Sequence, residues 1–160
     1  MARAAKNVDY VADLLKIREL YISATPRQRL SIVRQRLEDH HFGPNRLVTA
    51  VSAVEGLARC LLQHLGAKSK DDLRKVYPKY KDWTARSLVR EYLAKCGISD
   101  PAAFLEEDNW KLFGYAVDFR NVLVHECTYL GLDKFPSLIG ACEAVLEKLV
   151  ILGKVPDRRA

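Results

Sequence analysis

Apolar residues recur along this chain at intervals of three and four, and Gly or Pro residues separate the resulting segments. This spacing is typical of one face of a helix with about 3.6 residues per turn. No segment alternates apolar and polar residues between turn signals, as a half-buried strand would. The pattern predicts an all-α bundle without a sheet, with helices over residues 8–23, 26–39, 45–65, 69–76, 83–96, 110–127 and 136–152.

Several helix ends carry recognisable signals. Thr25-Pro26 and Asp100-Pro101 each place an N-cap residue before a first-turn proline, and the second pair starts the run that leads into 110–127. Ser69 has capping-box spacing to Asp72, and the helix it begins is expected to stop before Tyr77-Pro78. No linker is long enough to divide the chain, so residues 1–160 are predicted to form one helical domain.

The helix predicted over residues 110–127 carries a charge within its apolar half, and we expect this helix to be central in the bundle. Arg120 projects from the middle of that half, whose apolar members are Leu112, Phe113, Ala116, Val117, Phe119, Leu123, Val124 and Cys127. A guanidinium stays protonated, and burying it without a partner is very costly. The sequence therefore predicts either a buried carboxylate partner, such as Glu55, or a cleft in which an anion binds.

The same helix carries a polar stripe that contains Asp118, Asn121 and His125. Histidine is the side chain that titrates near neutral pH, and arginine binds phosphate through two parallel hydrogen bonds. Arg120 lies about 140° from His125 around an ideal helix. The arginine could reach around the helix end, or the arginine of one chain could meet the histidine of another across a dimer seam. The two residue types suit phosphodiester chemistry, but a helix-capping histidine and a core-paired arginine fit the pattern equally well.

The net charge of +6 is concentrated in residues 68–95, which hold nine Lys or Arg and four Asp or Glu. Such an excess suggests a polyanionic partner, although a solvated, lysine-rich helical face explains it as well. Aromatic residues interleave with the cations here, a mixture suited to single-stranded RNA. The candidate RNA-binding residues are Lys75, Lys79, Tyr80, Lys81 and Arg86.

Other classes of site lack support in the sequence. There is no CxxC pair, glycine-rich phosphate loop, serine triad or dinucleotide fingerprint, so we expect neither a metal nor a cofactor. Cys60 and His64 are four residues apart on a helix, but no second ligand pair accompanies them. Cys127 and Cys142 occupy apolar positions, where free thiols are usually buried. With no signal peptide and no apolar run long enough for a membrane span, we expect a cytoplasmic protein without a membrane partner.

The segment RNVLVH, from Arg120 to His125, resembles the motif of the HEPN superfamily of nucleotide- and RNA-acting helical proteins. The family's signature is an arginine, four to six residues and a histidine, with a polar residue, often asparagine, directly after the arginine. Asn121 stands at that position, and the motif lies on a late helix with one closing helix after it. Many members also carry an acid on an earlier long helix, for which Glu55 is the counterpart. The resemblance covers residues 45–152 and leaves the first two helices as an N-terminal extension.

The resemblance implies a metal-independent endoribonuclease that acts as a homodimer. The 2′-hydroxyl of RNA would attack the adjacent phosphate, giving a 2′,3′-cyclic phosphate and a 5′-hydroxyl. His125 would move the proton, Arg120 would stabilise the phosphorane charge, and Asn121 would orient His125 or contact phosphate. Such domains serve as toxins paired with an antitoxin or regulatory protein, or as effectors against phage. Others bind nucleotides or proteins without catalysis, and the sequence leaves that alternative open.

Overall fold

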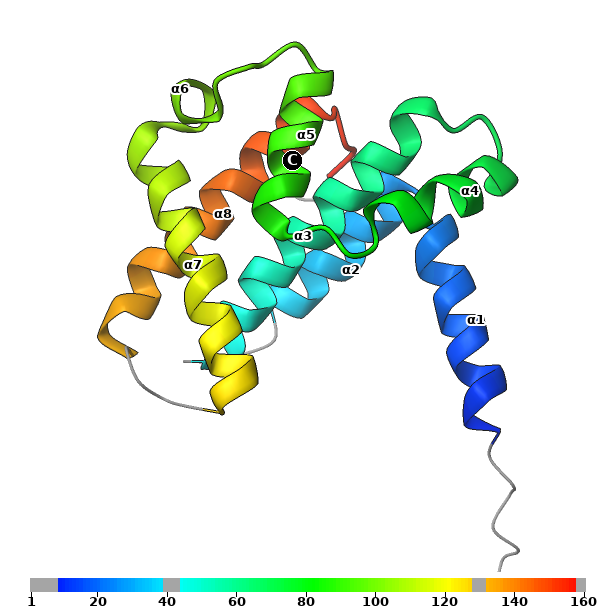
Figure 1. The fold of residues 1–160 in the computed structure, drawn as a ribbon, viewed down its shortest axis with the longest axis horizontal. Coiled ribbons are helices and arrows are strands. Elements are labelled where there is room, and N and C mark those ends of the chain that lie inside the picture. Colours follow the sequence, from blue (N-terminus) through cyan, green and yellow to red (C-terminus); the bar gives the residue numbers. More distant parts are fainter. Residues whose placement is uncertain (1–8, 39–43, 128–131, 158–160) are drawn as a thin grey trace, which may run out of the picture.

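The computed structural model describes residues 9–38, 44–127 and 132–157, and within these ranges every regular element is a helix (Figure 1). The all-α prediction is confirmed. The elements are α1 (Tyr10–Ser23), α2 (Pro26–Glu38), α3 (Pro44–Gly66), α4 (Lys70–Tyr80), α5 (Ala85–Lys95), α6 (Pro101–Leu105), α7 (Glu107–Glu126), the 3-10 turn η1 (Leu132–Lys134) and α8 (Phe135–Leu152). Among the described helices, none is long and apolar enough to cross a membrane.

The central helix of the bundle is α3, and the prediction that 110–127 would hold this place was wrong. α3 packs against α2, α4, α5, α7 and α8, and Figure 1 shows it in the middle of the molecule. Its apolar residues are spread around much of the helix, and Leu47, Val51, Val54, Leu57 and Ala58 are fully buried. α7 covers one side of α3 and also contacts α5, α6 and α8. The motif helix is therefore a flanking element that presents one face to α3 and another to solvent.

The predicted caps form as expected. The Ser69 hydroxyl accepts a hydrogen bond from the Asp72 N–H, and the Asp100 carboxylate accepts one from the Ala103 N–H. At the start of α2 the Thr25 hydroxyl accepts from the Gln28 N–H, while the Gln28 side chain accepts from the Thr25 N–H. This reciprocal capping box satisfies two amide groups that have no partner inside the helix.

Two helix boundaries differ from the sequence prediction. α4 does not stop before Tyr77-Pro78 but continues to Tyr80. Tertiary contacts hold this last turn, because the Tyr80 side chain is buried and the Tyr80 carbonyl accepts a hydrogen bond from Arg59 Nε. The run that starts at Pro101 breaks at Glu106, whose φ of 69° separates α6 from α7. Neither effect is encoded in local helix propensity.

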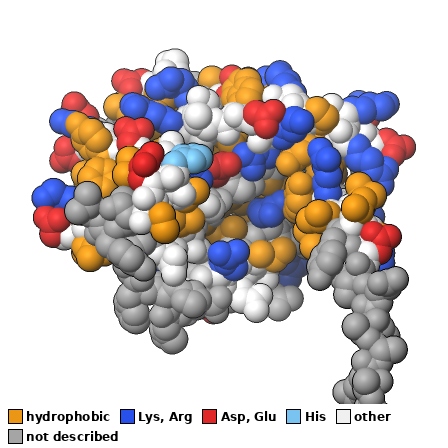
Figure 2. Space-filling model, turned by 60° about the horizontal axis from the view of Figure 1, so that its bottom comes forward, with side chains coloured by type: hydrophobic (Ala, Val, Ile, Leu, Met, Phe, Trp, Pro, Cys, Tyr) orange, Lys and Arg blue, Asp and Glu red, His pale blue; other side chains and the backbone are white. Residues whose placement is uncertain are grey.

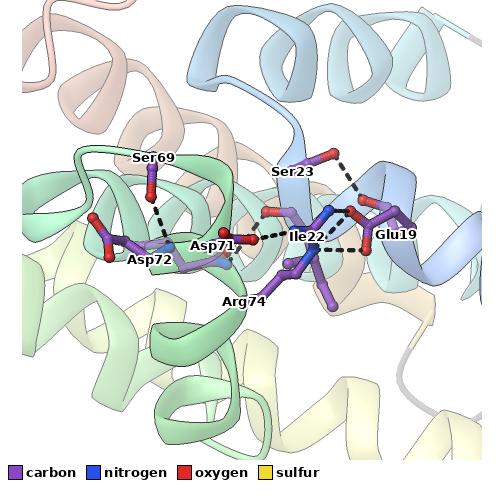
Figure 3. A network of polar contacts seen from close by, with 8 residues as sticks. Glu19, Ile22, Ser23, Ser69, Asp71, Asp72 and Arg74 are labelled. Atoms are coloured by element: carbon purple, nitrogen blue, oxygen red, sulfur yellow. Dashed lines mark hydrogen bonds and ion pairs between the residues drawn. The ribbon is translucent and has the colours of Figure 1, made fainter.

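α1 lies at the edge of the bundle, where its main helix contact is with α4. Arg74 of α4 pairs with Glu19 of α1 and with Asp71 of its own helix (Figure 3). Ile22 is buried, whereas most of the apolar side chains of α1 are exposed: Val11, Leu14, Leu15, Ile17 and Leu20. Figure 2 shows hydrophobic and basic side chains interleaved on the right of the view, on the side of the molecule where α1 lies.

Candidate functional site

Arg120 of α7 pairs with Glu55 of α3. Arg120 Nη2 donates to Glu55 Oε2 at 3.2 Å, and Arg59 Nη2 donates to Glu55 Oε1 at 2.7 Å. One carboxylate thus bridges two guanidinium groups, and we call these three residues the Glu55 cluster. The side chains of Arg120 and Glu55 are only 19% and 22% exposed. The sequence predicted for Arg120 either a carboxylate partner or a cleft in which an anion binds, and the structure shows the carboxylate partner.

The Glu55 cluster keeps an uncompensated positive charge, because two arginines share one acid. Arg120 Nε is buried and has no hydrogen-bond partner. Arg120 also lies near the Cys142 thiol of α8, whose pKa is raised to about 12 mainly by burial and by the Glu143 charge, while Arg120 acts in the opposite direction. One acid shared between two guanidinium groups leaves the cluster with excess positive charge.

Asn121 and His125 lie on the outer side of α7, and both side chains are exposed. They are one helical turn apart and project from the same face. His125 is in the last turn of α7. Arg120 faces α3, whereas His125 faces solvent, as the angle around the helix predicted. Within one chain the two side chains therefore do not share a helix face.

The outer face of α7 also exposes apolar side chains beside these polar ones. Tyr115, Val122 and Val124 are each about half exposed. The expectation that the Cys127 thiol would be buried was wrong, and Val124 of the predicted apolar half is exposed as well. Figure 1 shows the last turn of α7 at the edge of the bundle. Part of its circumference therefore faces solvent instead of another helix. Cys142, by contrast, is buried as predicted.

The candidate RNA-binding residues divide into two groups. Lys75, Lys79 and Lys81 are exposed on α4 and just after it, and the exposed Arg86 of α5 stacks on Trp110 at 4.9 Å from the ring centroid. Tyr80 is only 3% exposed, and its ring packs edge-on against Trp83. A buried ring cannot stack on a base, so the assignment of Tyr80 as an RNA-stacking residue was wrong.

A hydrogen bond links the Glu55 cluster to the basic segment. Arg59 Nε donates to the carbonyl of Tyr80 at 3.2 Å, and the exposed Lys79 and Lys81 flank that residue. Arg59 was not identified from the sequence, although its spacing of four residues from Glu55 is a recognisable ion-pair signal. The structure thus brings Glu55 and Arg120 together and connects them, through Arg59, to the end of α4.

A hollow of about 300 Å³ opens next to the Glu55 cluster, between α1, α2, α3 and α4. Its lining consists of Tyr21, Arg29, Ser52, Glu55, Gly56, Arg59, Gln63 and Tyr77. Sequence reasoning did not assign Tyr21, Arg29 and Ser52 to a common site, because they come from three helices whose proximity is a tertiary property. A larger hollow of about 950 Å³ lies along α1 and α2, away from the Glu55 cluster.

No group of three potential metal ligands occurs among the residues that the structure describes. Cys60 Sγ and His64 Nε2 both lie within hydrogen-bond distance of the Ala24 carbonyl, at 3.4 Å and 3.0 Å. Their spacing of four residues places both side chains on one face of α3, where they meet the same carbonyl. Burial raises the pKa of the Cys60 thiol to about 11, and the protonated thiol is the form that donates to a carbonyl.

No family model, curated protein or solved structure matches the chain. The candidate site consists of the Glu55 cluster between α3 and α7 and of the exposed Asn121 and His125 at the end of α7.

Proposed function

We propose that this protein is a metal-independent endoribonuclease of the HEPN type that acts as a homodimer. The observation that carries the proposal is the ion pair between Arg120 and Glu55. The resemblance in sequence pairs these residues with Asn121 and His125, and in the structure the arginine meets an acid on the earlier long helix. Asn121 and His125 are on the same helix as Arg120, and their exposed side chains are accessible to a substrate.

In the proposed reaction the RNA supplies its own nucleophile. The 2′-hydroxyl attacks the adjacent phosphorus, the bond to the 5′-oxygen breaks, and a 2′,3′-cyclic phosphate and a 5′-hydroxyl form. His125 transfers the proton, and Arg120 donates hydrogen bonds to the phosphorane oxygens. Asn121 orients His125 or contacts phosphate, and Glu55 holds the Arg120 guanidinium in place through the contact described above. Lys75, Lys79, Lys81 and Arg86 bind the RNA backbone.

The outer face of α7 supports the dimer in this proposal. Tyr115, Val122 and Val124 form a partly exposed apolar surface around Asn121 and His125. Pairing two such faces would bury apolar area and bring two copies of the motif helix to one cleft. The proposal further requires Arg120, which faces α3, to reach the same phosphate as His125 of the partner subunit.

A second candidate function is a non-catalytic module that binds an anion or a protein partner. The direction of the Arg120 side chain favours it, because within one chain the guanidinium faces α3 and does not share a helix face with His125. In the catalytic proposal the protein is a cytoplasmic toxin or phage-defence effector that an antitoxin or regulatory protein controls. In the alternative, His125 has only a structural role.

Incubation of the purified protein with RNA in EDTA, followed by analysis of the RNA ends, tests the proposal. His125→Ala should reduce cleavage by a factor of about 10² to 10⁴, while RNA affinity stays nearly constant. His64→Gln is the matched control, because His64 lies on α3 against the Ala24 carbonyl. RNA with a 2′-deoxy nucleotide at the scissile position should not be cut. If His125→Ala cleaves as fast as the parent, or if the parent cuts no RNA, the catalytic function is refuted and the binding module is favoured.

A further inference from the structure

The hollow beside the Glu55 cluster has an excess of positive charge. Arg29 of α2 and Arg59 of α3 line it, and Glu55 is the only carboxylate among its lining residues. Glu55 is itself shared between Arg59 and Arg120. Arg18 adds a further positive charge nearby, since its field acts on Tyr77 in the wall. An anion that entered this hollow would meet more positive than negative charge.

The two arginines of the wall are held in place before any ligand arrives. Arg29 Nη2 donates to the Tyr21 carbonyl at 2.8 Å, and its guanidinium lies 5.9 Å from the centre of the Tyr21 ring. Arg29 Nε is buried and has no hydrogen-bond partner. Arg59 is fixed by Glu55 and by the Tyr80 carbonyl. Arginines whose side chains are already ordered lose little entropy on binding a bidentate oxyanion.

The remaining wall offers neutral polar groups and aromatic surface. Tyr21 and Tyr77 have ring centroids 5.8 Å apart, and both are partly exposed. Burial, and then the hydrogen bond with Tyr21, raise the pKa of Tyr77, so its hydroxyl stays protonated and able to donate. Ser52 adds an exposed hydroxyl from α3. Gly56 also lines the hollow, and it has no side chain that could fill it. A Cβ atom at Gly56 would lie 3.8 Å from Arg29 Cδ.

We propose that this hollow binds a small phosphate monoester, with the phosphate on Arg29 and Arg59 and the organic part against Tyr21 and Tyr77. Its volume of about 300 Å³ is at the lower end of the range for small-molecule sites. The site is distinct from the RNA-cleaving groups on α7, so it can exist whether or not the protein cleaves RNA. It shares Glu55 with Arg120, and a phosphate on Arg59 therefore competes with Glu55 for that arginine.

Isothermal titration of the full-length protein with ribose 5-phosphate, inorganic phosphate and ribose tests the proposal without RNA. We expect ribose 5-phosphate to bind with a Kd between about 10 µM and 1 mM, phosphate to bind more weakly, and ribose not to bind detectably. The readout is independent of cleavage, so failure of one proposal does not decide the other. Saturable ribose binding as tight as that of ribose 5-phosphate would overturn the phosphate assignment, and so would the lack of binding by both phosphates.

Four variants locate the ligand. Ser52 is exposed, so Ser52→Glu and Ser52→Lys alter the charge at the rim without a loss of core packing. The first should weaken binding about tenfold and the second should strengthen it. Arg29→Lys keeps the charge but loses the planar fork, and should weaken binding about tenfold. Arg36→Lys is the matched control, because Arg36 is exposed on the same helix and does not line the hollow.

The same variants distinguish binding in this hollow from a general effect of the positive charge on the protein surface. Equal weakening by Arg29→Lys and Arg36→Lys, or unchanged binding in both Ser52 variants, would show that phosphate does not bind in this hollow. Thermal unfolding of each variant, measured alongside, verifies that the protein titrated is folded. If Arg29→Lys unfolds because its contact with the Tyr21 carbonyl is lost, the opposite signs expected for the two Ser52 substitutions still test the site.

Discussion

The contacts of the Glu55 cluster predict that the loss of stability depends on which partner of the ion pair is replaced. Glu55→Gln removes the carboxylate that two guanidinium groups share, so Arg59 and Arg120 are left close together with no counter-charge. Arg120→Met removes one guanidinium, keeps an apolar side chain of similar length, and leaves Glu55 paired with Arg59. The glutamate substitution should therefore cost clearly more than the arginine substitution, although both break the same contact.

The magnitude follows from distance and exposure. At the 3.2 Å between Arg120 Nη2 and Glu55 Oε2, an effective dielectric constant of about 20 gives an attraction of about 5 kcal/mol before desolvation is subtracted. Breaking a fully buried pair by removing one partner costs about 3–5 kcal/mol. Because about a fifth of each side chain is exposed, we expect Glu55→Gln to cost about 2–3 kcal/mol and Arg120→Met about 1 kcal/mol or less. The double variant should be less destabilised than Glu55→Gln alone.

Urea unfolding followed by far-UV circular dichroism measures these free energies. Glu147→Gln is the matched control, because Glu147 pairs with Arg34 but is 52% exposed, and Arg34 keeps a second partner in Asp157. That variant should lose about 0.5 kcal/mol or less. The reasoning is refuted if Arg120→Met costs as much as Glu55→Gln, or if Glu55→Gln costs no more than the exposed control.

Three further predictions concern glycines and thiols. Gly140→Ala should stabilise the protein by about 0.5–1 kcal/mol, because Gly140 is in the interior of α8 and a Cβ atom there would meet nothing within 4 Å. Gly153→Ala should destabilise the protein, because its Cβ atom would lie 2.9 Å from Leu61. Thermal unfolding of the two variants measures both effects. A thiol reagent at pH 8 should modify the exposed Cys127 at once and the buried Cys142 only on unfolding. Burial raises the pKa of Cys142 from 9.0 to about 12, so its contribution to stability should be constant below about pH 9 and decline as the pH rises towards 12, as alkaline unfolding curves can measure.

The helical class of the chain and its helix starts could be predicted from the sequence because they depend on local spacing. Ser69, Asp100 and Thr25 cap their helices through hydrogen bonds to residues three positions away. Glu55 could be identified as a partner for Arg120, since a charge in an apolar helix face needs a counter-charge. The same logic did not identify Arg59 as the second guanidinium on Glu55.

What the sequence could not determine depends on which helices meet. α3 became the central helix because its apolar residues surround much of its circumference and bind five neighbouring helices, whereas the last turn of α7 lies at the edge and leaves Val124 and Cys127 exposed. Tyr80 is buried because a tertiary hydrogen bond and packing carry α4 past Pro78. Local spacing determines where a helix starts and which residues share a face. Only packing between distant segments determines which face is covered, and so which charges meet in the Glu55 cluster and around the hollow beside it.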